Sequence, residues 1–215
     1  MQLAIFDVDG TLISGYSTEK RFMVWLLRRG LIGPRQVLAS AWFIVRWFPV
    51  FGKHVFRKNK AYLSGLSEAT IAAQAALFVA ALPESVWIRP SLTELRLRKE
   101  QECIVVLLSG TLQSILDAMA ERLGADDAVG TICRTADGRY QAAPPLRHPF
   151  GAEKAALQQG ISERYQASNA DVTSYADSGF DILMLSQAGR PVAVCPDSEL
   201  AAWARINNHR VIEPG

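Results

Sequence analysis

The sequence predicts an α/β protein whose core is a Rossmann-like, doubly wound parallel sheet with an all-helical cap inserted into it. Two observations support this fold class. From residue 88 onward, short apolar runs alternate with segments of helical spacing, as expected for a parallel sheet with helices on both faces. Between residues 14 and 87, helical segments alone replace this alternation. We therefore predict a core of residues 1–13 and 88–215 and a helical cap of residues 14–87.

The first predicted strand, residues 2–6, is a short apolar run that leads directly into two carboxylates. The cap sequence that follows has apolar side chains at helical spacing, interrupted by glycine and proline near residue 33. The predicted cap helices cover residues 19–29, 36–47, 53–63 and 67–82.

In the core, residues 103–108 form a continuous apolar, β-branched run, which is typical of a strand buried on both faces. Residues 128–134 and 139–141 flank an Ala-Asp-Gly sequence and are predicted to form a hairpin. The other predicted core strands are residues 172–175 and 191–194. The predicted core helices cover residues 91–100, with Ser91 as the N-cap, and residues 112–123, 151–159, 181–187 and 198–207.

The composition excludes several classes of protein. Hydrophobic residues make up 49% of the 215 residues and charged residues 20%, which excludes a disordered chain, a fibrous repeat and a disulfide-stapled module. Cys103, Cys133 and Cys195 lie far apart in the sequence without metal-binding spacing, so we expect reduced core cysteines.

The formal net charge of +2 conceals an uneven distribution. Residues 14–65 contain ten bases and one acid, a net charge of +9, whereas the other 163 residues carry 13 bases and 20 acids, a net charge of −7. The same basic segment is rich in Trp and Phe. It either binds an anionic partner or forms a solvated basic face with its aromatic side chains buried.

The most apolar run of the cap, residues 37–51, is shorter than the roughly 20 residues that a transmembrane helix needs, and it contains Arg46 and Pro49. The N-terminus has strand character and no leader pattern. We therefore expect a cytoplasmic protein. Trp, Phe and Arg side chains suit a membrane interface, so peripheral contact of the cap with the inner membrane surface stays open.

The strongest local motif is FDVDGTL at residues 6–12. Asp7 and Asp9 follow an apolar strand at the end where doubly wound sheets bind ligands, and side chains two residues apart on a strand share a face. Gly10 allows a sharp turn and exposes backbone N–H groups to an anion. Taken alone, the same residues also suit an ordinary turn.

Three later segments place polar residues at predicted strand ends or helix starts. Ser109 and Gly110 follow the second buried strand, and Lys154 lies near a helix start. Asp177 and Asp181 follow a third apolar strand. Each feature alone has an ordinary alternative, such as a helix cap or a solvated surface residue. Together they predict one polar site, because the carboxyl ends of parallel strands meet at the same edge of a sheet.

In order and spacing, these four segments resemble the motifs of the haloacid dehalogenase superfamily, and specifically its phosphoserine phosphatase-like branch. Residues 7–12 match the DxDGT/STL motif of the family, and Ser109 matches its strand-end Ser/Thr. Lys154 matches the family lysine, and residues 176–185 match GDSxxDxxML. A helical cap between the first two motifs is characteristic of that branch. The resemblance covers essentially the whole chain.

The resemblance implies a Mg²⁺-dependent phosphatase that hydrolyses phosphoric monoesters through an aspartyl-phosphate intermediate. Asp7 would be the nucleophile, and Asp9 would be the general acid and base. The Asp7 carboxylate, the Asp9 carbonyl and the Asp177 carboxylate would hold Mg²⁺, which prefers oxygen ligands.

The resemblance also implies which residues bind the phosphoryl group. Its oxygens would be held by Thr11, Ser109, Gly110 and Lys154. Asp181 would orient Lys154 or a water bound to the magnesium.

Two departures from the family pattern are present. Ala176 stands where the family usually has glycine, but the spacing of Asp177 and Asp181 is kept. Phosphoserine phosphatases usually carry a glutamate soon after the first motif that contacts the substrate amino group, whereas residues 14–18 contain no acid before Glu19. We therefore do not expect specificity for phosphoserine.

Selectivity in capped families of this kind usually comes from the cap, which is basic and aromatic here. We predict a small phosphorylated metabolite as the substrate. A phospholipid phosphate of the phosphatidylglycerophosphate or lysophosphatidate type is the alternative, since it would also use the apolar part of the cap. A third interpretation is a weakly active module that binds anionic membrane or nucleic acid. The full set of site acids and the lack of a nucleic-acid-binding motif argue against it.

The three histidines, His54, His148 and His209, have no metal-ligand spacing, and we expect them to be structural. His148 lies in a proline-rich loop just before Lys154, so it is the histidine expected nearest the site.

Overall fold

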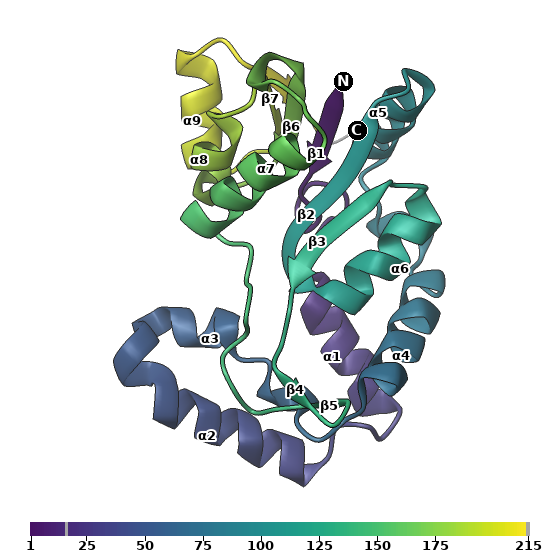
Figure 1. Cartoon of the computed structure of the whole chain (residues 1–215), viewed down its shortest axis with the longest axis vertical. Helices are drawn as coiled ribbons and strands as arrows, with labels where there is room; N and C mark the ends of the chain where they lie inside the picture. The colour runs from purple at the N-terminus through teal and green to yellow at the C-terminus, as the bar shows by residue number, and fades with distance from the viewer. Residues whose placement is uncertain (16, 214–215) are drawn as a thin grey trace.

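The computed structural model describes residues 1–15 and 17–213 and is built on a six-stranded sheet (Figure 1). Tyr16, in the predicted cap, and residues 214–215, at the end of the predicted core, lie outside the described residues. All neighbouring strands of this sheet are parallel. In spatial order the strands are β3 (Asp127–Thr131), β2 (Ile104–Leu112), β1 (Leu3–Phe6), β6 (Val172–Ala176), β7 (Arg190–Val194) and β8 (Arg210–Ile212). The predicted doubly wound parallel sheet is confirmed.

Helices cover both faces of the sheet because alternate strand residues point to opposite sides. In β1, Ala4 and Phe6 belong to one buried apolar cluster and Leu3 and Ile5 to another. The first cluster includes side chains of α5 (Arg89–Glu100) and α6 (Gln113–Leu123). The second includes side chains of α7 (Ala152–Arg164), α8 (Ile182–Leu185) and α9 (Ser198–Ile206).

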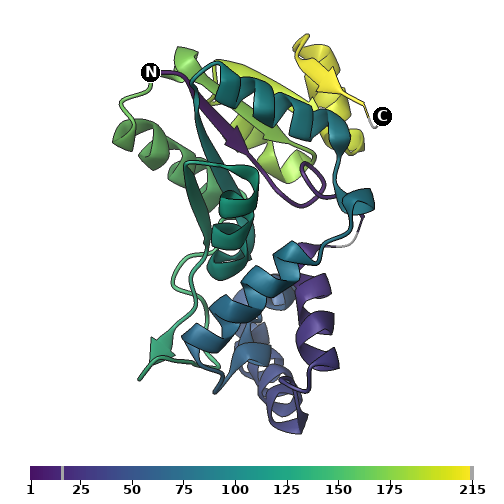
Figure 2. The same ribbon diagram turned by 90° about the vertical axis from the view of Figure 1, so that its right-hand side faces the viewer.

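Along the chain, a block of helices lies between β1 and α5. In space, this helical block lies beyond one end of the sheet (Figures 1 and 2). Its α-helices are α1 (Thr18–Arg28), α2 (Pro34–Phe51), α3 (Val55–Lys58) and α4 (Glu68–Ala80). Its short 3-10 turns are η1 (Gly52–His54), η2 (Ala61–Leu63) and η3 (Glu84–Val86). Among the described residues, no helix combines the length and the apolar character that crossing a bilayer requires.

The single helix predicted for residues 53–63 is wrong, since three short pieces occupy this stretch. Gly52 has a φ of +52° and ends α2 with a turn that glycine adopts readily. Asn59 is extended, and its side-chain oxygen accepts a hydrogen bond from the backbone N–H of Ala61. Local side-chain bonds of this kind compete with helical hydrogen bonding, which explains the break.

The predicted N-cap at Ser91 is also wrong. Helix α5 begins at Arg89, and Pro90 lies in its first turn, where its missing N–H costs nothing. Ser91 is therefore inside the helix and fully buried, and among the described residues its hydroxyl has no hydrogen-bond partner.

The predicted hairpin forms with shorter arms. Of the residues predicted as its first arm, 128–131 lie in β3 of the large sheet. The hairpin itself starts after the predicted arm, with β4 (Thr135–Ala136), which pairs with β5 (Arg139–Tyr140). Asp137 and Gly138 both have positive φ, as a two-residue hairpin turn of this type requires. The hairpin contacts the helical block, where the backbone N–H of Gly65 bonds the Tyr140 carbonyl at 2.9 Å.

Candidate active site

The loop after β1 carries two aspartates into the carboxyl-end crevice of the sheet, where neighbouring strands β2 and β6 lie on opposite sides of β1. Asp7 is 6% exposed, and its backbone N–H bonds the Tyr175 carbonyl of β6 at 2.9 Å. Gly10 in this loop has a φ of +86°, and a Cβ there would lie 1.9 Å from Asp177 Oδ2. Only glycine therefore allows the β1 loop and Asp177 to approach this closely.

Lys154 joins two of the aspartates. Its ammonium is 2.7 Å from Asp7 Oδ1 and 2.8 Å from Asp181 Oδ2, and the side chain is 4% exposed. Burial alone would lower the pKa of Lys154, but the Asp7 and Asp181 carboxylates raise it above its usual value. Lys154 is therefore a fixed cation between the two carboxylates.

The carboxylates outnumber this cation. One oxygen each of Asp7, Asp177 and Asp181 lie within 4.8 Å of one another. Burial, opposed by Lys154 and reinforced by the neighbouring acids, raises the pKa of Asp7 to about 8. Burial and Asp181 raise the pKa of Asp177 to about 6. Such a cluster of oxygen donors with excess negative charge fits a divalent cation, and Mg²⁺ prefers these ligands.

Asp9 is held from two sides by residues that sequence reasoning did not identify. The backbone N–H and the hydroxyl of Thr18 each donate to Asp9 Oδ1 at 2.6 Å. The Thr111 hydroxyl donates to Asp9 Oδ2 at 3.2 Å. Thr18 is the first residue of α1, with Ser17 as its N-cap, so Asp9 links the core to the first helix of the block.

The residues expected to bind phosphate lie in two places. Ser109 and Gly110 belong to β2 and line the cavity beside Asp7, Lys154 and Asp177. The regular pairing of β2 with β3 shifts register between residues 108 and 112, which places them in an irregular part of the strand.

Thr11 lies apart from these residues. It is fully buried, and its hydroxyl makes a long, 3.5 Å hydrogen bond to Asp177 Oδ1. Its side chain contacts a proposed metal ligand and does not line the cavity.

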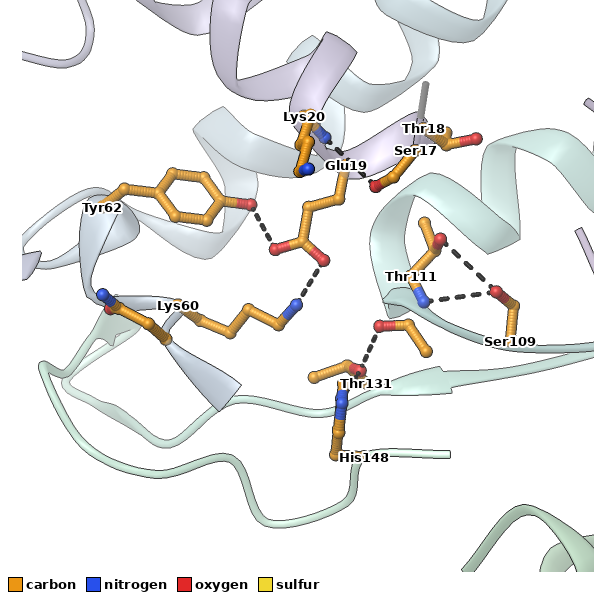
Figure 3. Close-up of polar contacts among 12 residues, drawn as sticks. Ser17, Thr18, Glu19, Lys20, Lys60, Tyr62, Ser109, Thr111, Thr131 and His148 are labelled. Atoms are coloured by element: carbon orange, nitrogen blue, oxygen red, sulfur yellow. Dashed lines mark hydrogen bonds and ion pairs between the residues drawn. The ribbon is translucent and has the colours of Figure 1, made fainter. Parts of the chain in front are cut away.

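A cavity of about 700 Å³ joins the aspartates to the helical block. On the helical side it contains a cluster absent from our sequence prediction, Glu19, Lys60 and Tyr62 (Figure 3). Lys60 forms an ion pair with Glu19 Oε2, and the Tyr62 hydroxyl donates to Glu19 Oε1 at 3.0 Å. Burial, followed by the Glu19 charge, raises the pKa of Tyr62 well above its usual value, so it stays a neutral donor.

His148 lines the same cavity and is buried. Its Nδ1 lies 2.9 Å from the Thr131 hydroxyl (Figure 3), and that hydroxyl donates to the Gly110 carbonyl at 2.6 Å. Because the Thr131 proton is committed to Gly110, His148 Nδ1 must be the donor to Thr131. Burial, with nearby Lys and Arg charges, lowers the pKa of His148 to about 3, so the ring is neutral at physiological pH.

The helical block also contacts the core through aromatic rings. The guanidinium of Arg57 in α3 lies 4.4 Å from the ring centre of Phe150 and 5.2 Å from that of Phe180. Phe150 precedes α7 and Phe180 precedes α8, so one basic side chain of the block bridges two core loops at the cavity.

Comparison with known proteins finds a family match over most of the chain. Residues 4–186 match the haloacid dehalogenase-like hydrolase family. Phosphoserine phosphatase SerB1 of Mycobacterium tuberculosis is 29% identical, covering 94% of this chain and 67% of that protein. Histidinol-phosphatase of Neisseria meningitidis is 27% identical, covering 94% of both chains. A Bordetella pertussis protein of unknown function has the same fold, with a TM-score of 0.81 at 20% identity over 99% of this chain and 98% of that one.

Proposed function

The chain belongs to the haloacid dehalogenase-like hydrolase family, and we propose that it is a Mg²⁺-dependent phosphatase acting on small phosphomonoesters through an aspartyl-phosphate at Asp7. One observation carries the proposal. Asp7, Asp177 and Asp181 converge around the Lys154 ammonium at the base of a cavity that Ser109 also lines. Carboxylate nucleophile, cation ligands and phosphate-binding groups are thus within reach of one phosphoryl group.

In the first step, a carboxylate oxygen of Asp7 forms a bond to phosphorus while the bond from phosphorus to the ester oxygen breaks. Asp9 donates a proton to that leaving oxygen. Asp9 Oδ1 already accepts two hydrogen bonds from Thr18, whereas Oδ2 accepts one from Thr111. Oδ2 is therefore the oxygen that carries the transferred proton.

In the second step, water attacks the phosphorus and its proton goes to Asp9, while the bond between phosphorus and Asp7 breaks. Inorganic phosphate leaves and both aspartates return to their starting states. The Lys154 ammonium, the Ser109 hydroxyl and the Gly110 N–H bind the phosphoryl oxygens during both steps.

The Asp7 and Asp177 carboxylates would hold the magnesium, together with the Asp9 carbonyl. When bound, Mg²⁺ offsets the repulsion between the Asp7 carboxylate and the phosphate. The three carboxylates of Asp7, Asp177 and Asp181 outnumber the one ammonium of Lys154, so the cluster keeps excess negative charge. A second cation would neutralise that excess.

The cavity supports a substrate other than phosphoserine. Glu19 lies in it, but the Glu19 carboxylate is already paired with Lys60 and Tyr62. A substrate ammonium would have to displace Lys60, which is buried and costly to leave unpaired. We therefore infer that the substrate carries no amino group beside its phosphate. Tyr16, in the segment where phosphoserine phosphatases usually place a glutamate, lies outside the described residues.

A phospholipid phosphate is the second candidate. Phe56 and Phe180 line the cavity although they are 63% and 55% exposed, which gives the cavity an apolar rim. Such a rim suits an acyl chain beside the phosphate.

The decisive experiment measures phosphate release with and without Mg²⁺ from a chromogenic phosphate ester, soluble metabolite phosphates, and lysophosphatidate and phosphatidylglycerophosphate in detergent. We expect Mg²⁺-dependent turnover that Asp7→Asn reduces at least about a thousand-fold. Asp137→Asn, in the exposed hairpin turn, is the matched control and should retain full activity. Undiminished turnover by Asp7→Asn would disprove the covalent route. Absence of turnover on every ester would leave a binding module as the function.

A further inference from the structure

The outer face of α2 exposes a row of large apolar side chains. Val37, Leu38, Trp42, Val45 and Phe48 are each between 51% and 70% exposed. Their spacing of three, four and seven residues places them on one side of the helix. A contiguous apolar face of this size on a surface helix marks a binding surface.

The inner face of the same helix is already used by the fold. Phe43 packs with Val55 and Ala61 in a separate small core, and Trp47 and Phe51 pack against that core. Packing of the fold therefore explains the inner apolar side chains, whereas the outer ones stay exposed among the residues that the structure describes. A surface helix of a globular protein normally has a polar outer face, and α2 does not.

Basic residues of the same segment border this apolar face. Residues 20–67 contain no Asp or Glu. Arg35 and Arg46 lie about three turns apart along one edge of α2, and Lys53 follows its end. Within the part of the chain that the structure describes, no salt bridge joins these three bases to a carboxylate. In Figure 1, α2 lies at the edge of the molecule farthest from the sheet.

From this combination we propose that the outer face of α2 docks on an anionic lipid bilayer. An apolar stripe of Trp, Phe and Val bordered by Arg and Lys is the pattern of a helix that lies in the membrane interface. The bases would contact anionic headgroups, while the apolar side chains would enter the boundary between headgroups and acyl chains.

Charge distinguishes this partner from two others. A second copy of the chain that docks through the same face would add bases from residues 20–67, and this segment has no Asp or Glu to offset Arg46 and Lys53. A nucleic acid offers phosphates for the bases but no apolar layer for Trp42 and Phe48. Of these three partners, the bilayer alone offers both anionic groups for the bases and an apolar layer for the row of apolar side chains.

Docking would also place the cavity near the bilayer. Ser40 of α2 lines the cavity, as does Phe56 of α3, which is 63% exposed. Helix α2 therefore contributes to both the docking surface and the cavity, and α3 contributes to the cavity. Membrane binding itself does not depend on the proposed phosphatase activity, so the two are tested separately.

The test is flotation of the full chain with vesicles of mixed phosphatidylglycerol and phosphatidylcholine, compared with vesicles of pure phosphatidylcholine. We expect binding to the anionic vesicles that weakens as salt is added. Arg46→Gln with Lys53→Gln should weaken binding about 30-fold, since each base near an anionic surface contributes about fivefold. Leu38→Gln with Trp42→Gln and Val45→Gln should weaken it by more than about tenfold.

A control removes exposed apolar side chains elsewhere on the surface. Leu183→Gln with Ile206→Gln alters α8 and α9, where these residues are 48% and 78% exposed, and should bind vesicles like the unmodified chain. Circular dichroism and hydrolysis of the soluble chromogenic ester report folding independently of lipid. Subtracting the tryptophan fluorescence spectrum of the Trp42→Phe variant from that of the unmodified chain isolates the emission of Trp42. This emission should shift to shorter wavelength when the chain binds the anionic vesicles.

Three results would overturn the proposal. The first is no flotation of the folded, unmodified chain with anionic vesicles at low salt. The second is equal loss of binding in the α2 variants and in the control. The third is a dimer in light scattering that the α2 triple variant dissociates, which would identify a second copy of the chain as the partner of this face.

Discussion

Acidification gives a quantitative test of the buried His148 beside the cavity. The ring is 7% exposed and is hydrogen-bonded to Thr131. Burial, followed by the charges of Lys60, Lys58 and Arg57, lowers its pKa from 6.5 to about 3. In the unfolded chain the same ring titrates near its usual pKa, so folding disfavours its protonated form.

The direction of the effect follows from this difference. As the pH falls below 6.5, the unfolded chain takes up a proton at His148 while the folded protein does not. His148 therefore lowers the free energy of unfolding progressively between pH 6.5 and about 3, and it has little effect at pH 7.5. At pH 5.0, about 1.5 units below the unfolded pKa, the loss is about 2 kcal/mol.

His148→Gln isolates this contribution, because an amide still donates a hydrogen bond to Thr131 but does not titrate. Urea unfolding of both proteins is measured at pH 7.5 and pH 5.0 in the presence of a metal chelator. The unfolding free energy of His148→Gln minus that of the unmodified protein should rise by about 2 kcal/mol when the pH is lowered from 7.5 to 5.0. His54→Gln, at an exposed ring in the helical block, is the matched control.

A change smaller than about 0.5 kcal/mol between the two pH values would refute the assignment of His148 as a buried neutral ring. An equal change in the His54 variant would show that the effect is general to the protein and is not due to burial at the cavity.

Three other substitutions test the site. Lys154→Met leaves buried carboxylates unpaired and should lower the unfolding free energy in chelator by about 3–5 kcal/mol, measured in urea at neutral pH; a loss below about 1 kcal/mol contradicts the ion pairs. Gly10→Ala places a methyl group against Asp177, so the Mg²⁺ concentration for half-maximal activity should rise about tenfold or more; an unchanged titration contradicts the close approach. Glu19→Gln removes the carboxylate that pairs with Lys60, so the Lys60 ammonium becomes available to a substrate carboxylate. The KM of carboxylated phosphate esters should therefore fall more than the KM of esters without a carboxylate, and equal changes in the two KM values would contradict this expectation.

The sheet and the acidic part of the site could be predicted from sequence because both depend on local pattern and one topological rule. Strands buried on both faces are continuous apolar runs, and their carboxyl ends meet at one edge. That rule predicts the grouping of Asp7 and Asp177, and Lys154 joins them in the prediction as a residue near a helix start. The three-residue strand β8, with two exposed residues, has no such apolar run and was not predicted.

The helical side of the cavity could not be predicted in the same way. Glu19 meets Lys60 and Tyr62 across more than 40 residues of sequence, and their contact depends on how helices pack. No spacing rule relates residues on different helices whose packing angle is unknown. The break in the helix predicted for residues 53–63 could not be predicted from sequence spacing either. It depends on the backbone angles of two single residues, Gly52 and Asn59.

The hydrogen bonds of Asp9 connect these two parts of the molecule. Thr18 donates to Asp9 with both its backbone N–H and its hydroxyl, and it is also the first residue of α1. A movement of α1 away from the β1 loop would therefore lengthen two short hydrogen bonds to the proposed general acid. The cavity lies between the same two parts, so binding a substrate there and orienting Asp9 depend on one arrangement of α1. We therefore expect the basic helical block to orient Asp9, the proposed proton donor, through Thr18 in addition to attracting an anionic substrate.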